Sequence, residues 1–176
     1  PAFVAQSELA ARLTFLRLLV NLFTDRLEVA HQQAIEWLER GERADALTVA
    51  TVVSIAAIVE IERGELTKAQ ARMLRARSVI ERSESAYGHA WVAILTACIE
   101  IGQARPNVAD TVLGEARAKV VPVIGEDAGV VATLDFVHAR ALLDLGRASG
   151  ASTLAARGLK SAARHGSLTS LEQGLV

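Results

Sequence analysis

The side chains that could support catalysis or hold a metal ion are scattered along this sequence. The histidines His31, His89, His138 and His165 lie far apart and show no paired metal-ligand spacing. The sequence contains no Gly-Lys-Ser/Thr, so nothing resembles the phosphate-binding loop of a nucleotide hydrolase. Cys98 has no neighbouring base and lies in an apolar run, where a free thiol behaves as a small buried hydrophobe. We therefore predict no catalytic residue, no metal site and no cofactor.

Basic side chains could instead meet an anionic partner along two segments. At helical spacing they would line one face of each segment: Lys68, Arg72, Arg75 and Arg82 in the first, and Arg157, Lys160 and Arg164 in the second. The formal charge of −1 and the pI near 6.5 provide no overall attraction to nucleic acid or anionic lipid. We therefore interpret both as solvated outer faces and expect no direct nucleic acid contact.

The composition favours closely packed helices. Hydrophobic residues make up 51% of the 176 residues but aromatic residues only 4%, so the apolar content is mostly Ala, Leu, Val and Ile. The uncharged stretches 46–59 and 87–99 are shorter than the roughly 20 residues that cross a bilayer, so we expect no membrane span. The single cysteine indicates a reducing, cytoplasmic location. We expect one domain over residues 1–176 and, because no Met precedes Pro1, a fragment of a larger protein.

Capping and breaker residues divide the chain into helices. Ser7, Asp45 and Thr67 are expected as N-caps, and Pro122 with Gly125 is expected to close one segment. In the first segment, residues at three- and four-residue steps predict an apolar helix face made of Leu9, Leu13, Leu16, Val20 and Phe23. The expected helices span 7–23, 26–40, 46–63, 68–83, 85–101, 106–121, 127–145 and 151–165, with a ninth beginning near Leu168.

A repeat is visible where the first helix of each expected pair ends. The four turn residues are Asp25, Gly64, Gly102 and Gly146. Their spacings of 39, 38 and 44 residues are nearly constant, which indicates a solenoid of stacked helix pairs. We therefore predict an all-α fold of about four antiparallel helix hairpins, with a period near 40, followed by the start of a ninth helix.

The clearest unit places Ala57 before the turn at Gly64, and Ala69, Met73 and Ala76 after it. This order resembles the tetratricopeptide motif, in which a small residue precedes a glycine turn and small and large apolar residues follow. The resemblance covers nearly the whole chain and implies a right-handed solenoid that binds a partner.

Two further features resemble one class of regulators. The period near 40 is longer than the tetratricopeptide period of 34 and is similar to the looser repeats of the large ATP-binding LuxR-class transcriptional regulators, typified by MalT. The stretches 142–147, 158–166 and 171–175 resemble the region just before the DNA-binding module of those regulators. This resemblance implies a signal-sensing, self-associating repeat domain whose ATPase and helix-turn-helix parts lie outside this chain.

In tetratricopeptide-like arrays the first helix of each pair lines a concave groove. Counting back 13, 10, 6, 3 and 2 residues from each expected turn selects the residues that should face the groove. The candidate site for a ligand or partner consists of Thr51, Ser54 and Ile58, of His89, Val92, Thr96, Ile99 and Glu100, and of Thr133, Phe136, Arg140 and Asp144. The same offsets select Arg12, Phe15, Leu19, Leu22 and Phe23 before the first turn, an apolar set that could equally contact another repeat.

Such a groove would be mostly apolar with a few polar anchors, as ligand and peptide sites are. Arg140 could pair with a ligand carboxylate while Phe136 and Ile99 hold an apolar body. The alternative is that Arg140 pairs only with Asp144 one turn further on, and that the apolar members pack against neighbouring repeats.

Three functions remain open on the sequence alone. The first is a sensor domain of a bacterial transcriptional regulator, in which a small-molecule effector or a protein shifts the population of one curvature or self-association state. The second is a general interaction scaffold without a transcriptional role. The third is a small helical enzyme. Exposed apolar patches would favour the first two, whereas a closed pocket with perturbed carboxylates would favour the third.

Overall fold

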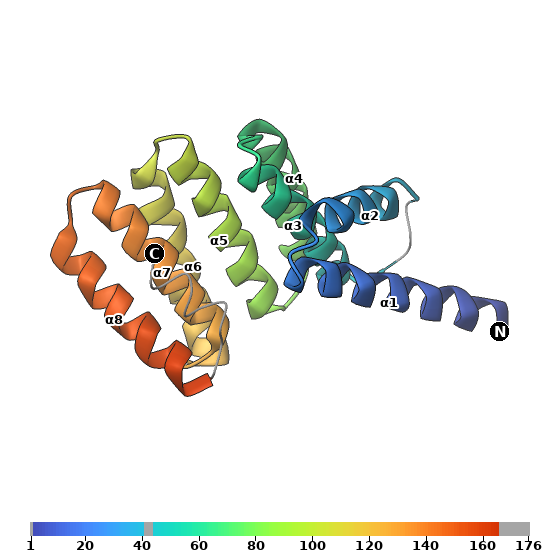
Figure 1. Ribbon diagram of the computed structural model, residues 1–176. Coiled ribbons are helices and arrows are strands. Elements are labelled where there is room, and N and C mark those ends of the chain that lie inside the picture. Colours follow the sequence, from blue (N-terminus) through green and yellow to red (C-terminus); the bar gives the residue numbers. More distant parts are fainter. Residues whose placement is uncertain (1, 41–43, 166–176) are drawn as a thin grey trace. The chain divides into compact units, whose positions relative to one another are not determined.

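The computed structural model describes the backbone of residues 2–40 and 44–165, and the side chains of residues 13–40 and 44–164. This part of the chain consists of α-helices and contains no strand, which confirms the all-α prediction (Figure 1). The helices are α1 (Ala2–Phe23), α2 (Leu27–Arg40), α3 (Ala46–Glu62), α4 (Leu66–Ile80), α5 (Ala86–Gly102), α6 (Pro106–Ile124), α7 (Gly129–Asp144) and α8 (Ala148–His165). The expected ninth helix lies outside the described residues. None of the helices described is long and apolar enough to cross a membrane.

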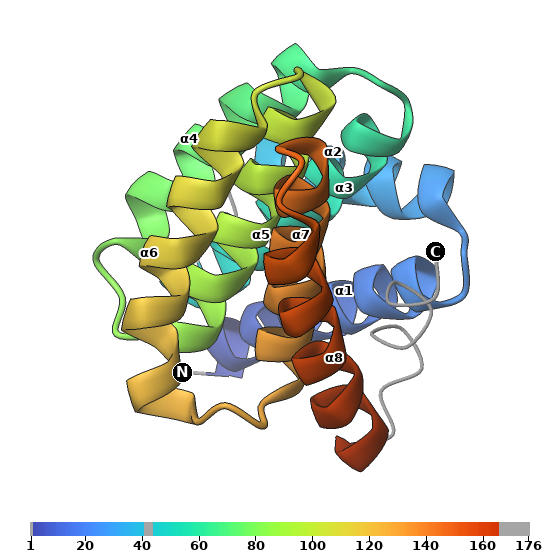
Figure 2. The same cartoon turned by 90° about the vertical axis from the view of Figure 1, so that its left-hand side faces the viewer.

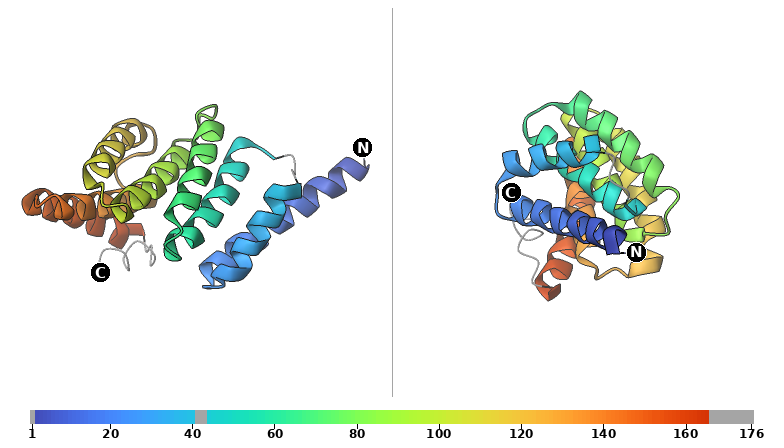
Figure 3. Two further views of the ribbon diagram at one scale, coloured as in Figure 1. Left: turned by 90° about the horizontal axis from the view of Figure 1, so that it is seen from above. Right: turned by 90° about the vertical axis from the view of Figure 1, so that its right-hand side faces the viewer.

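The chain divides into two compact units, Pro1–Ser83 with α1 to α4 and Glu84–Val176 with α5 to α8. Within the first unit, α3 packs against α4 and also contacts both α1 and α2 (Figure 3). Within the second unit, α7 packs against α8 and also contacts both α5 and α6 (Figure 2). The third helix of each unit therefore contacts the fourth helix, which follows it, and both helices of the pair that precedes it.

Two of the helix starts are capped by side chains. The backbone N–H and the hydroxyl of Thr48 donate to the carboxylate of Asp45, at 3.0 and 2.6 Å, so the predicted cap of α3 is confirmed. These hydrogen bonds, that of the hydroxyl first, lower the pKa of Asp45 below its ordinary value. At α5 the hydroxyl of Ser85 accepts a hydrogen bond from the N–H of Gly88 at 3.1 Å.

The end of α4 and the start of α8 each lie three residues before the expected position. Three limits that were predicted from a capping or breaking residue are also wrong. Helix α1 begins at Ala2, so Ser7 lies inside it, and α4 begins at Leu66 after Glu65, so Thr67 is not its N-cap. Helix α6 continues through Pro122 to Ile124. Pro122 has no N–H to donate to the carbonyl four residues before it, so one helical hydrogen bond is lost. Only two helical residues follow Pro122, so this loss falls at the end of α6 and not in its interior.

Four turns between helices share one backbone conformation. Asp25, Gly64, Ala104 and Gly146 have positive φ values of 57°, 71°, 57° and 73°. After each of them, the next residue donates its N–H to the carbonyl of the fifth residue before it, and the distance is 2.8 Å in all four turns. This is the hydrogen bond that closes a helix when the residue after its end is left-handed. The prediction that Gly102 forms the third turn is wrong, because Gly102 is the last residue of α5 and Ala104 takes the left-handed conformation.

The left-handed residues give a common register to the four pairs. Their spacings are 39, 40 and 42 residues, more even than those expected from the glycines. We number positions from them, so that position +5 lies five residues after the left-handed residue and position −12 lies twelve residues before it. Position +5 is a buried alanine in every pair: Ala30, Ala69, Ala109 and Ala151. Position +12 is buried in every pair as well: Trp37, Ala76, Ala116 and Gly158.

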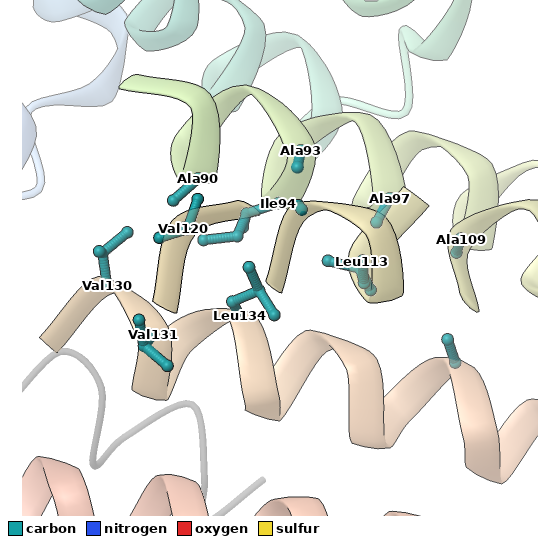
Figure 4. Packing of buried hydrophobic residues seen from close by; sticks show 12 residues of the cluster. Ala90, Ala93, Ile94, Ala97, Ala109, Leu113, Val120, Val130, Val131 and Leu134 are labelled. Atoms are coloured by element: carbon teal, nitrogen blue, oxygen red, sulfur yellow. The ribbon is translucent and has the colours of Figure 1, made fainter. Parts of the chain in front are cut away.

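The core of the second unit lies where α5, α6 and α7 meet. Ile94 of α5, Leu113 of α6 and Leu134 of α7 are at most 2% exposed, and they point into the space between the three helices (Figure 4). The corresponding cluster in the first unit joins Ala34 of α2 to Val52 and Ile55 of α3. In both units the third helix thus completes the core of the preceding pair.

Helix α1 is apolar on two faces. Leu18 is fully buried, and Phe15 and Leu22 pack against the same cluster. The residues that the sequence spacing singles out lie elsewhere: within the described side chains they are Leu13, Leu16, Val20 and Phe23, which are 50, 55, 59 and 72% exposed. The apolar spacing of three and four residues in this segment therefore marks an exposed face of α1.

Candidate functional site

The candidate site residues of the first unit lie on α3 and are only partly accessible. Ser54 is buried, with 7% of its surface exposed, whereas Thr51 and Ile58 are half-buried. The hydroxyl of Thr51 donates to the carbonyl of Leu47 at 2.8 Å, one turn back. Thr51 and Ile58, separated by two turns of α3, are therefore the members of this set that reach the surface.

The candidate residues on α5 are mostly buried because the predicted turn was two residues too early. Val92, Ile99 and Glu100 are 6, 1 and 7% exposed, and His89 and Thr96 are half-buried. Counted from Ala104, Val92 and Ile99 occupy positions −12 and −5. In α7 these positions hold Leu134 and Ala141, which pack toward the preceding pair. Glu100 is engaged at the turn, where Nε of Arg105 lies 2.6 Å from its carboxylate.

The candidate residues on α7 divide into buried and exposed members. Thr133 and Phe136 are 4 and 6% exposed. Phe136 packs against α8, so closely that a methyl group added at Gly158 would lie 2.7 Å from its ring. Arg140 and Asp144 are accessible, with 67 and 35% of their side chains exposed, and form an ion pair at 3.3 Å.

The corrected register identifies other residues on α5 as the equivalents of Thr51 and Ile58. At positions −13, −6 and −3 stand Trp91, Cys98 and Ile101, and all three are half-buried. Tyr87, one turn before Trp91, is 52% exposed and meets its ring edge to face, with 6.4 Å between the centroids. Sequence reasoning missed this set because a left-handed alanine cannot be distinguished from a helical one.

An available signal would have corrected the register. Ala50, Ala90 and Ala132 stand at position −14 of α3, α5 and α7, and all are at most 3% exposed. Aligning Ala90 with Ala50, and Ala109 with Ala69, places the third turn at residue 104. Buried alanines mark the close approach of the two helices in a pair, so they report the register more directly than the glycines do.

In the second unit, the corrected positions lie on α5 and α7, two helices that contact each other, and the α5 members also pack against the buried core. We name this set the α5–α7 face and define it by Trp91, Cys98, Ile101, Arg140 and Leu143. Leu143 is 55% exposed and Arg140 carries the exposed charge of the face. An ion pair at i and i+4 in water contributes only about 0.5 kcal/mol, so a ligand carboxylate can compete with Asp144 for Arg140.

Other charged clusters hold helices together. Asp135 of α7 is 1% exposed and accepts hydrogen bonds from Arg157 of α8, at 2.6 and 2.7 Å, and from Arg117 of α6, at 3.2 Å. The hydrogen bond to Asp135 raises the pKa of Arg157 above its already high usual value. Similarly, Arg72 of α4 lies 2.6 Å from the buried Glu60 of α3.

These contacts bear on the two basic faces read from the sequence. Lys68, Arg72, Arg157 and Arg164 form ion pairs with Glu65, Glu60, Asp135 and Asp127. Much of the positive charge on these faces is therefore balanced within the fold. The prediction that the chain makes no direct contact with nucleic acid stays a prediction.

Two further features of the described residues concern metal and small-molecule sites. Within them, no group of three His, Cys, Asp or Glu residues is placed to hold a metal ion. A hollow of ≈ 410 Å³ lies on the first unit, where Val29, His31, Gln32 and Ile35 of α2 meet Arg63. It is open to solvent, whereas small-molecule sites usually enclose most of their ligand.

No model of a known protein family matches the sequence, and no curated protein matches it significantly. The function is therefore inferred from the residues of this chain.

Proposed function

We propose that this chain is a tetratricopeptide-like interaction domain that binds a peptide segment of a partner protein on the α5–α7 face. The segment carries apolar side chains and at least one carboxylate. The observation that carries the proposal is the composition of this face, which combines half-buried Trp91 and Ile101 on α5 with exposed Leu143 and Arg140 on α7. Aromatic and arginine side chains are the residues that most often dominate binding energy at interfaces. Apolar surface of this kind favours an interaction domain over an enzyme.

The repeated turn supports the tetratricopeptide-like solenoid. Small residues stand at position +5 of every pair and at position +12 of the last three, with Met73 and Leu113 at position +9 of the second and third pairs. This is the order of small, large and small residues that the unit around Gly64 shares with the tetratricopeptide motif. In such arrays the first helices of successive pairs form one binding surface.

A peptide suits the α5–α7 face better than a small effector. The face is made of half-buried and exposed side chains on two helices, and a small molecule lying on it would keep much of its own surface in water. An extended or helical segment spans several such side chains and gains from each of them. The carboxylate that we assign to the partner would displace Asp144 from Arg140.

A narrower proposal is that this chain is the repeat domain of a transcriptional regulator. It rests on the sequence resemblance to the LuxR class. Part of the stretch that carries it, residues 166–176, lies outside the described residues. The gene sequence on either side tests this proposal. A phosphate-binding loop encoded upstream and a helix-turn-helix encoded downstream would support it, and their absence would leave the general interaction scaffold.

The interaction proposal can be tested by thermal shift with a panel of short peptides rich in Leu and Glu, alongside a panel of metabolites. At a peptide concentration about 100-fold above Kd, binding stabilises the folded chain by roughly 2.7 kcal/mol, which raises Tm by several degrees. We expect this increase for the wild type, and its loss in Arg140→Ala and in Leu143→Asp.

Two variants on α6 serve as matched controls. Lys119→Ala removes an exposed cation, and Val123→Asp places a charge on a side chain that is 68% exposed. Both should respond to the peptide as the wild type does. If no peptide raises Tm, or if Arg140→Ala and Leu143→Asp respond like the controls, the peptide proposal is wrong. A metabolite that acts through Arg140 would favour the effector sensor instead.

A further inference from the structure

The exposed apolar face of α1 has a defined place in the repeat register. Counted from Asp25, Leu13, Leu16 and Val20 stand at positions −12, −9 and −5. They are 50, 55 and 59% exposed, and each is separated from the next by one turn of the helix. Isolated exposed leucines are common, but a continuous apolar stripe of this kind marks a contact surface.

The same positions are packing positions in the third helix of each unit. In α3 they hold Val52, Ile55 and Val59, which are at most 1% exposed, and Val52 and Ile55 pack against the cluster of α1 and α2. In α7 they hold Leu134, Val137 and Ala141, which pack against the cluster of α5 and α6. Positions −12, −9 and −5 therefore carry the contact with the helix pair before them.

The surface that receives these positions is alike in both units. On the preceding pair it is made of apolar residues at positions −7, +5 and +9: Leu18, Ala30 and Ala34 for α3, and Ala97, Ala109 and Leu113 for α7. Alanine at position +5 lets the incoming helix approach both helices of the pair. A partner for α1 needs the same features, which a single helix does not offer.

We propose that the α1 face, defined by Leu13, Leu16 and Val20, docks against a further helix pair of the same repeat type, which presents alanine at position +5 and apolar residues at positions −7 and +9. The proposal continues an interface that occurs in both units. It goes beyond the peptide site of the α5–α7 face and rests on different residues.

The test supplies such a helix pair from the chain itself. A second copy of residues 85–128, which contain α5, α6 and the connection to α7, replaces residues 1–7 and is joined directly to Glu8. Glu8 and Gly129, the first residue of α7, both stand at position −17, so the fusion brings the added pair to α1 as it is brought to α7. The fusion should be monomeric by light scattering, bind less of an apolar-surface dye than the wild type, and have a Tm higher by about 5 °C.

Leu16→Glu provides the decisive comparison. In the wild-type chain this substitution places a charge on an exposed side chain and should move Tm by less than about 1 °C. In the fusion the same substitution buries a charge under the added pair, so it should abolish the increase in Tm that the fusion gains over the wild type. Leu74→Glu, at a side chain of α4 that is 64% exposed, should be without effect in both proteins.

Three results would overturn the proposal. The first is a fusion that binds as much dye as the wild type, which would mean that the added pair leaves the α1 face open. The second is an equal effect of Leu16→Glu in both proteins. The third is a wild-type dimer that Leu16→Glu dissociates while the fusion remains dimeric, which would assign the α1 face to a second copy. None of these results depends on peptide binding at Arg140.

Discussion

The carboxylate of Asp135 is a structural charge at the centre of the second unit. It is 1% exposed and receives hydrogen bonds from arginines of both α6 and α8. The sequence does not reveal this cluster, because Arg117 and Arg157 lie 18 and 22 residues away from Asp135. Residue type and local spacing predict ion pairs within a helix, such as that of Arg140 and Asp144, and do not predict those that join helices.

Replacing Asp135 by alanine should destabilise the chain strongly. Two partly buried guanidinium groups would lose their common acceptor, and breaking a buried ion pair from one side costs on the order of 3 kcal/mol. Asp144→Ala, on the same helix, breaks an exposed pair and should cost about 0.5 kcal/mol or less. Urea unfolding followed by circular dichroism measures both values. Equal costs for the two variants would show that Asp135 does not hold α6 and α8 to α7.

Asp45 makes the stability of α3 depend on pH. Its pKa is lowered in the folded chain by hydrogen bonds from Thr48, so the ionised cap stabilises the fold above the ordinary Asp pKa, and this contribution is lost as the pH falls through the folded-state value. Asp45→Ala should cost about 1 kcal/mol at pH 7. The difference from the wild type should shrink below about pH 4.

Asp45→Asn is the control for that experiment, because asparagine caps helices as well as aspartate does but does not titrate. Thermal unfolding from pH 7 down to pH 3 should show a difference between wild type and Asp45→Ala that depends on pH. For Asp45→Asn the stability at pH 7 should be close to that of the wild type. A pH-independent effect of Asp45→Ala would contradict an ionised cap.

At the scale of elements, the sequence predicts the type of the helices and, over residues 2–165, their number, but not every turn. Period and capping residues locate all eight helices, with limits that differ from the observed ones by five residues or fewer at α1 and by fewer elsewhere. The third turn was misplaced because glycine is the usual left-handed residue, and Ala104 takes that conformation instead. A displacement of two residues then placed three of the five candidate residues on α5, Val92, Ile99 and Glu100, at buried positions.

Two glycine substitutions distinguish the observed register from the one expected from the sequence. Gly146 has a φ of 73°, so Gly146→Ala should lower the free energy of unfolding by about 1 kcal/mol. Gly102 is helical, so Gly102→Ala should instead raise it by roughly 0.5–1 kcal/mol. Chemical denaturation gives both signs. Destabilisation by Gly102→Ala as large as that by Gly146→Ala would return the turn to Gly102.

At the scale of the whole molecule, the chain presents two surfaces to which we assign different partners. The α5–α7 face combines apolar side chains with the exposed Arg140, whereas the α1 face is apolar and stands in the register of helix-to-helix packing. The sequence indicated a groove of mixed character but could not separate the residues that reach the surface from those that pack between helices. That separation depends on burial, which follows from the turn register and from contacts between helices distant in sequence.

The most direct test of the peptide proposal is an NMR titration of the full chain with the peptide that raises Tm most. We expect the largest shifts at the indole N–H of Trp91 and at the amides of Cys98, Ile101 and Leu143, and no comparable shifts on α6 or along the α1 face. Shifts that cluster on α6 and α8, or at Leu13, Leu16 and Val20, would contradict the assignment of the binding site to the α5–α7 face.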